Sequence, residues 1–137
     1  MRLVAILTLS VLALSATSLH AQVPCTPNSA QITGPDVSNN VLNYQAGSAA
    51  TSLTHGITNT IWLAGLSPLP TGFQVNLAPC PNICLAVIPD LSFIAPATFS
   101  LETPAFVPSS TFYPQGVTDI FGCLSESEAL TVNIIGN

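Results

Sequence analysis

The sequence predicts an all-β protein that folds as a single antiparallel β-sandwich of roughly seven to nine short strands. Two observations lead to this prediction. The apolar residues form short runs that alternate with polar residues or are rich in β-branched and aromatic types, and proline, glycine and asparagine separate these runs. Outside the N-terminal segment, no window keeps the apolar spacing of an amphipathic helix for more than one turn. A helical bundle is therefore disfavoured.

Residues 1–21 are predicted to be a secretory signal peptide. Met1-Arg2 precedes the mostly apolar run Leu3 to Leu14, and Ser15 to Ser18 and the small residue Ala21 follow, which is the order of segments in such a peptide. The run is too short to cross a bilayer. We expect cleavage after Ala21, which leaves residues 22–137 as one disulfide-linked β-sandwich domain with no membrane span.

Residues 22–137 contain neither lysine nor arginine, because the one basic residue of the chain is Arg2. The six carboxylates of the chain all lie in this part. Phosphate groups are bound mainly by cationic side chains, so nucleic acid is excluded as a partner and anionic membrane surfaces are disfavoured. A glycan or protein partner at the cell surface or in the medium stays open, and no cofactor is expected.

The four cysteines, Cys25, Cys80, Cys84 and Cys123, all follow the expected cleavage site. An even number of cysteines in a short exported domain predicts two disulfides rather than a zinc site, because exported thiols are normally oxidised. The residues alone leave all three pairings of four cysteines open. This pattern places the protein outside the cytoplasm, either secreted or at the cell surface.

The stretch Phe73 to Ile88 is predicted to be the central hairpin of the sandwich. Apolar residues alternate with polar ones from Phe73 to Leu77, which places one face of the first strand on a core. The uninterrupted apolar run Leu85 to Ile88 indicates a strand that is covered on both sides. Two prolines, an asparagine and Cys80 supply the corner between the two strands.

The other strands are predicted from short β-rich runs between turn residues. Trp62 is expected in the core, within a strand over 58–66 that Pro68, Pro70 and Gly72 end. Phe106 is expected in a loop or edge strand because prolines flank it. The remaining predicted strands cover residues 30–33, 41–45, 52–54, 91–94, 98–101, 111–120 (bent near Pro114) and 129–135.

No residue is assigned a catalytic or metal-binding role. His55 is the only histidine of residues 22–137, and it is expected to lie in solvent at the end of a strand. No serine completes a Gly-x-Ser-x-Gly elbow, which argues against a serine hydrolase. Asp119, Glu126 and Glu128 are close in sequence but lack the spacing of a calcium loop, so a solvated acidic loop is favoured over a metal site.

Aromatic side chains are the usual means by which a sandwich binds sugars. Tyr44, Tyr113 and Trp62 could form such a platform. The apolar neighbours of Trp62 instead favour a place in the core. Tyr44 and Tyr113 are therefore the two candidate ligand-contacting residues.

The middle and C-terminal parts of the chain carry short, mostly apolar motifs at Trp62 to Leu66, Leu69-Pro70, Cys84 to Asp90, Thr98 to Leu101 and Thr111 to Val117. On these motifs, the chain from Val41 to Ile135 resembles a small β-sandwich domain found at the C-terminal end of exported planctomycete-type bacterial proteins. The resemblance implies a sandwich that contains disulfides and has no assigned activity or catalytic residue. In this chain the unit is expected to stand alone behind the predicted signal peptide, which departs from that pattern.

The resemblance also implies a disulfide pairing. It pairs Cys25 with Cys84, which leaves Cys80, a cysteine additional to the pattern, to pair with Cys123. The main alternative pairs Cys80 with Cys84 and Cys25 with Cys123. Together with the absence of a catalytic motif, the resemblance suggests a secreted, non-catalytic structural or binding module of unknown ligand. The alternatives are a carbohydrate-binding module that uses Tyr44 or Tyr113 and a small secreted hydrolase that uses His55.

Overall fold

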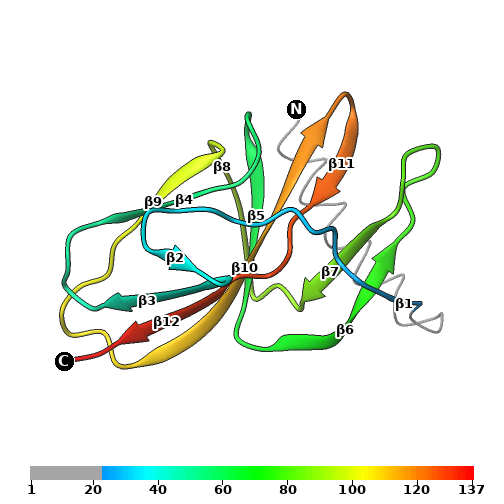
Figure 1. Cartoon of the computed structure of the whole chain (residues 1–137). Helices are drawn as coiled ribbons and strands as arrows, with labels where there is room; N and C mark the ends of the chain where they lie inside the picture. The colour runs from blue at the N-terminus through cyan, green and yellow to red at the C-terminus, as the bar shows by residue number, and fades with distance from the viewer. Residues whose placement is uncertain (1–22) are drawn as a thin grey trace.

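The structure, a computed structural model, describes residues 23–137, so the predicted signal peptide lies outside the described part of the chain. Every regular element of the described residues is a β-strand, which confirms the all-β fold class (Figure 1). In chain order the strands are β1 (Pro24–Cys25), β2 (Val37–Ser38), β3 (Val41–Gln45), β4 (Thr51–Thr54), β5 (Thr60–Gly65), β6 (Pro68–Val75), β7 (Ile83–Val87), β8 (Leu91–Ala95), β9 (Thr98–Leu101), β10 (Ser110–Ile120), β11 (Cys123–Glu126) and β12 (Thr131–Ile135).

Strand β10 is the longest and pairs with three partners along its length. It pairs first with β12, then with β5 from Tyr113 to Thr118, and finally with β11 from Val117 to Ile120. The first change of partner falls next to Pro114, where the sequence predicted a bend. These pairings build one sheet in the order β2-β3-β12-β10-β5-β8, with β11 added on β10.

One strand pair departs from the predicted antiparallel arrangement. Strands β3 and β12 run parallel, with Leu42 opposite Val132 and Tyr44 opposite Ile134. All other strand pairs of the described residues are antiparallel. The parallel pair is possible because β3 and β12 lie near opposite ends of the described chain, so a long connection separates them.

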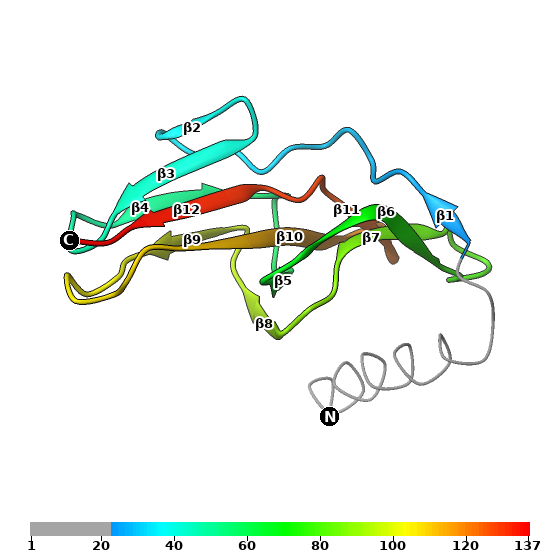
Figure 2. The ribbon, with the colours of Figure 1, turned by 90° about the horizontal axis from the view of Figure 1, so that it is seen from below.

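Two smaller sheets complete the fold. Strands β1, β6 and β7 form one of them, and β4 and β9 form the other. Strands β2, β3, β4, β9 and β12 lie toward one end of the molecule and β1, β6 and β7 toward the other, with β5 and β10 between them (Figure 2). The central pair is therefore β5 with β10. The predicted central hairpin, β6 with β7, is present but lies at one end.

A hydrophobic core lies on each face of the central pair. Successive residues of a strand point to opposite faces, so Trp62 packs in the first core and Leu63 in the second. The first core also contains Ile32, Leu42, Tyr44, Ala46, Leu53, Leu130, Val132 and Ile134. The second contains Phe73, Ile83, Leu85, Val87 and Val117. Strand β5 is thus covered on both sides, and the layers form a sandwich-like arrangement.

The β6–β7 hairpin has the predicted antiparallel pairing, with Phe73 opposite Leu85 and Val75 opposite Ile83. The strand predicted over 58–66, β5, does end before Pro68. The prolines do not separate it from the next strand, however, because β6 itself begins at Pro68. The register shifts between Pro68 and Phe73, so the part of β6 that contains proline is irregular. Irregular strand segments accommodate residues that lack a backbone N–H.

Gln115 connects the central sheet to the β6–β7 sheet without a strand ladder. Its amide is completely buried, and its Nε2 donates hydrogen bonds to the carbonyl oxygens of Cys84 and Ser127, at 2.9 and 2.8 Å. Its Oε1 accepts a hydrogen bond of 2.9 Å from the backbone N–H of Ala86. One side chain thus satisfies backbone groups of β7 and of the segment between β11 and β12.

Residues 23–137 form twelve strands, more than predicted, and two of them, β1 and β2, are only two residues long. The predicted strand over 30–33 is reduced to one bridge between Thr33 and Thr54. Strand β11 was not predicted at all. It forms a hairpin with β10 through the two-residue turn Phe121-Gly122, and phenylalanine is not a residue type that signals a turn.

Two disulfides are present, Cys25 to Cys84 within the three-stranded sheet and Cys80 to Cys123 between that sheet and the large one. The first joins β1 to β7, and the second joins the β6–β7 loop to the start of β11. This is the pairing that the resemblance implied, and no cysteine is free. Two disulfides in a small domain are typical of an oxidising environment outside the cytoplasm. Among residues 23–137 there is no helix long and apolar enough to cross a membrane.

Candidate functional site: an apolar groove

An open apolar groove lies beside the first core, next to Trp62 and Phe99. It has a volume of about 460 Å³. Strand β5 and the beginning of β10 contribute to one part of its wall, and β8 and β9 contribute to the other. The lining residues are Trp62, Leu63, Ala64, Gly65, Leu66, Asp90, Leu91, Phe93, Phe99, Leu101, Ser110, Thr111, Phe112 and Pro114.

Strand β8 leaves the groove open because it is the edge strand of its sheet. It pairs with β5 on one side and has no partner on the other among the described residues. Its residues from Leu91 to Ile94 are all exposed, and none of them is charged. Charged residues, prolines or a covering loop usually protect an exposed edge strand. Strand β8 has none of these within its length, which is unusual for a surface that stays in water.

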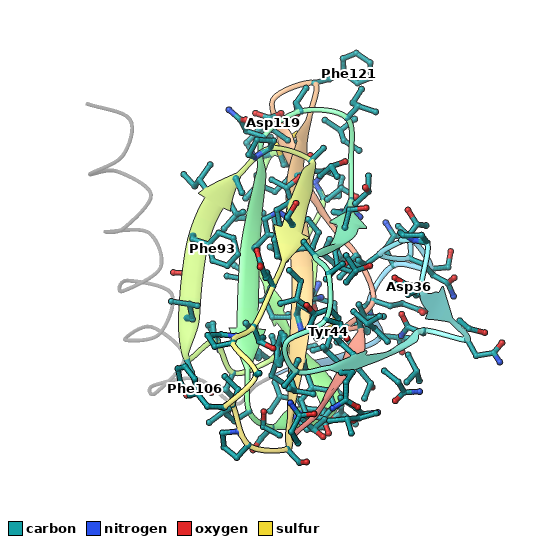
Figure 3. The ribbon with its side chains drawn as sticks, turned by 90° about the vertical axis from the view of Figure 1, so that its left-hand side faces the viewer. Asp36, Tyr44, Phe93, Phe106, Asp119 and Phe121 are labelled. Carbon is teal, nitrogen blue, oxygen red and sulfur yellow. A yellow bond between two sulfur atoms is a disulfide. The ribbon has the colours of Figure 1, made fainter. Side chains whose placement is uncertain are left out.

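Aromatic rings lead from the groove into the first core. Phe93 of β8 packs edge-on against Phe99 of β9, with ring centres 5.6 Å apart, and Phe99 packs in the same way against Trp62 at 4.6 Å. Trp62 is only 1% exposed, as the sequence predicted. The side chain of Phe93 lies at the surface on β8 (Figure 3). The groove is therefore a continuation of a packed core rather than a chance hollow between loops.

The chemistry of the groove is that of a site for apolar side chains. Its lining is almost wholly apolar, and Ser110, Thr111 and Asp90 are the polar residues in it. One carboxylate oxygen of Asp90 already accepts a hydrogen bond of 2.9 Å from the backbone N–H of Leu66. A sugar needs several well-placed hydrogen-bonding groups, which this lining does not offer.

A second, more polar hollow of about 570 Å³ lies between the N-terminal lead-in and β11. It is lined by Thr26, Pro27, Asn28, Ser29, Pro81, Asn82, Ile120, Cys123, Leu124, Ser125 and Glu126. The carboxylate of Glu126 accepts a hydrogen bond from the backbone N–H of Asn28 at 3.2 Å, so it ties the lead-in to β11. This contact gives Glu126 a structural role.

The prediction that His55 lies in solvent was wrong, because its side chain is 7% exposed. It does follow the end of a strand, β4, but its ring packs over Gly116 of β10, where a Cβ atom would come within 2.5 Å of Cδ2. Its Nε2 is buried without a hydrogen-bond partner. Burial lowers the pKa of His55 below its usual 6.5, and the nearby charge of Glu126 partly offsets this.

The structure separates the two tyrosines that the sequence proposed as ligand contacts. Tyr44 lies in the first core at 4% exposure, and its hydroxyl donates a hydrogen bond of 2.8 Å to the carbonyl oxygen of Ser48 (Figure 3). Tyr113 is half-buried against the second core. They belong to different cores and do not form one platform. Neither lines the apolar groove.

The acidic residues near the C-terminus do not form the solvated loop that was predicted. Asp119 lies on β10, where its carboxylate accepts a hydrogen bond of 2.7 Å from the N–H of Gly122. Glu126 is buried at the end of β11, and Glu128 follows that strand. Among residues 23–137 no group of three or more histidine, cysteine, aspartate or glutamate side chains could hold a metal ion.

Sequence reasoning did not find the groove. Its walls come from β5, β8, β9 and β10, which span residues 60–120, and no local pattern shows that β8 and β9 pair with different sheets. The one local signal was the run Leu91 to Ala95, which contains no charged residue and has Ser92 as its single polar residue.

The fold and the groove define this chain as an all-β, disulfide-linked, sandwich-like domain with an apolar surface site. In comparisons with known proteins, no family model, curated protein or solved structure matches the chain.

Proposed function

We propose that the chain is a secreted, non-catalytic binding module that holds apolar side chains of a protein partner in the apolar groove lined by β5, β8, β9 and β10. The observation that carries this proposal is the uncharged edge strand β8 beside an open groove with an almost wholly apolar lining. Large exposed apolar surfaces on soluble domains usually mark interaction sites. The two disulfides and the resemblance to domains of exported proteins support a place outside the cell.

The positions of the other candidate residues support a binding role over catalysis or sugar recognition. His55 is buried with Nε2 unpaired, so a substrate has no direct approach to it in this conformation. Tyr44 offers almost no surface to a sugar, and Tyr113 lies against the other core. A hydrolase that uses His55 and a carbohydrate-binding module that uses Tyr44 or Tyr113 both depend on residues that do not line the groove.

An environment-sensitive dye that fluoresces on apolar protein surfaces tests the groove at low protein concentration. We expect the native protein to bind the dye and the double substitution Leu66→Ser with Leu91→Ser, called the groove variant below, to lose most of this binding. Both leucines line the groove and are 69% and 59% exposed, so the fold should tolerate the change. Phe106→Asn, which changes an exposed residue outside the groove lining, is the control.

Activity assays test the non-catalytic part of the proposal. Ester, peptide and glycoside substrates should show only background turnover, and a glycan array should show no binding. Turnover that disappears in His55→Ala, or glycan binding that disappears in Tyr113→Ala, would contradict the proposal. Equal dye binding by the native protein and the groove variant would remove the groove as the site.

A further inference from the structure

The hairpin between β10 and β11 ends in a side chain that the fold does not use. Phe121 is 103% exposed, and its neighbour Ile120 is 47% exposed. The ring of Phe121 lies at the end of the hairpin and points away from the rest of the molecule (Figure 3). It therefore makes no contribution to either core.

The backbone at this tip has a conformation that phenylalanine disfavours. Phe121 has a φ of 53° and Gly122 a φ of 84°, so both turn residues are in the left-handed region. Asparagine, aspartate and glycine suit these positions, whereas a bulky side chain is strained there. The same chain uses Asn39 and Asn40, with φ of 50° and 58°, in the turn between β2 and β3. Strain at an exposed aromatic residue points to a contact outside the fold.

The tip is also held in place before any partner binds. The disulfide between Cys80 and Cys123 ties the hairpin to the β6–β7 loop directly beside the turn, because Cys123 is the first residue after Gly122. The carboxylate of Asp119 accepts a hydrogen bond from the N–H of Gly122 across the turn. A rigid apolar projection loses little conformational entropy when it binds, which favours association.

The apolar groove lined by β5, β8, β9 and β10 has the size and the chemistry to receive this tip. An apolar cavity of roughly 150 Å³ accommodates a benzene ring, and the groove has a volume of about 460 Å³. Phe121 together with part of Ile120 can therefore enter it. The aromatic rings Phe93 and Phe99 at the groove offer edge-to-face contacts to an incoming phenylalanine.

We propose that the protein self-associates by inserting Phe121 of one molecule into the apolar groove of a second copy. This inference rests on the proposed function of the groove and names its partner. The tip and the groove are different surfaces of the same chain, so the contact is heterologous. Each dimer that forms in this way still has one free tip and one free groove, and association continues beyond two molecules.

Charge and apolar area favour a second copy over a lipid surface. Residues 23–137 contain no lysine or arginine that could attract the tip to anionic lipid. Within the β10–β11 hairpin, Phe121 and Ile120 are the only exposed large apolar residues, and Asp119 lies beside them. Between two copies, both molecules carry a net negative charge, so added salt screens their repulsion and strengthens the association.

Sedimentation velocity of the purified, disulfide-intact protein, from about 10 µM to about 1 mM, tests the proposal. The native protein should form larger species as its concentration rises, and more so at higher salt. Phe121→Asn, the tip variant, and the groove variant should each weaken association at least about tenfold. The tip variant should also melt a few degrees higher than the native protein, because asparagine suits the turn. Phe106→Asn removes a similarly exposed phenylalanine at the other end of the molecule and should associate like the native protein (Figure 3).

A mixing experiment distinguishes a contact between tip and groove from other modes of association. The tip variant retains an intact groove and the groove variant retains an intact tip, so an equimolar mixture should form a one-to-one complex and nothing larger. A native protein that stays monomeric throughout, a tip variant that associates normally, or a mixture that fails to pair would overturn the proposal. Binding of the native protein to phosphatidylcholine vesicles, lost in the tip variant, would assign the tip to lipid and overturn it too. If the native protein still binds the dye better than the groove variant does when this proposal has failed, the groove remains the proposed binding site, but its partner is not a second copy of the chain.

Discussion

The substitution Gln115→Met should strongly destabilise the protein, because the Gln115 amide connects three backbone groups that no other side chain satisfies. Methionine has nearly the same shape but cannot form the hydrogen bonds to Cys84, Ala86 and Ser127. Each buried group left without a partner costs about 1–3 kcal/mol, and the apolar methionine side chain offsets part of this. We expect a loss of about 3–6 kcal/mol, a large part of the 5–15 kcal/mol that is typical of a domain.

Denaturant unfolding at equilibrium, with the disulfides intact and followed by the fluorescence of buried Trp62, measures this loss. Gln45→Met is the matched control, because the exposed amide of Gln45 also donates two hydrogen bonds, to Ile135 and Asn137. Water can replace those bonds, so the control should lose less than about 1 kcal/mol. Equal losses for the two variants, or a loss below about 1 kcal/mol for Gln115→Met, would refute this account of how the sheets are joined.

Three further predictions concern the histidine and the second disulfide. Because burial lowers the pKa of His55, its neutral form is favoured in the fold, and stability should be lost as the pH falls from 6.5 toward the folded pKa. Thermal melts between about pH 8 and pH 5 should show this loss, and His55→Gln should reduce it. Gly116→Ala should lower the free energy of unfolding by about 2 kcal/mol, because the new Cβ meets the His55 ring. The double variant with His55→Ala should lose less than the sum of the two single losses, because the ring that the Cβ meets is then absent. Replacing both Cys80 and Cys123 by serine should cost about 2–4 kcal/mol in urea unfolding, because the bridge closes a sequence separation of 43 residues. A melting temperature that does not change with pH would contradict the first prediction. An unfolding midpoint equal to that of the native protein would contradict the second for Gly116→Ala and the third for the double serine variant.

Local alternation was sufficient to place most strands. The prediction for β3 matches its bounds, and so does the prediction for β9, because in both a short β-rich run ends at recognisable turn residues. In the strand predicted over 129–135, Leu130, Val132 and Ile134 recur at every second position, and all three are buried in the first core. These features depend only on neighbouring residues, which is why the sequence shows them.

The features that sequence reasoning missed depend on residues far apart in the chain. The burial of His55 follows from the missing side chain at Gly116, on a strand whose pairing the sequence does not reveal. The groove exists because β8 and β9, joined by a short loop, pair with different sheets. The β10–β11 hairpin was missed because Phe121 occupies a turn position that local rules give to asparagine or glycine. That mismatch is also the observation that suggests a contact for the tip.

A dilution series followed by backbone amide NMR of nitrogen-15-labelled protein tests the central claim most directly. If the tip of one molecule binds the groove of another, amide signals should shift with concentration in two regions only, around Phe121 in the β10–β11 turn and along the groove lining formed by β5, β8, β9 and the beginning of β10. The same signals should not shift in Phe121→Asn. Signals that stay constant over the whole concentration range, or that shift at β2, β3 and β12 instead, would contradict the claim that this chain uses its tip and its groove to bind itself.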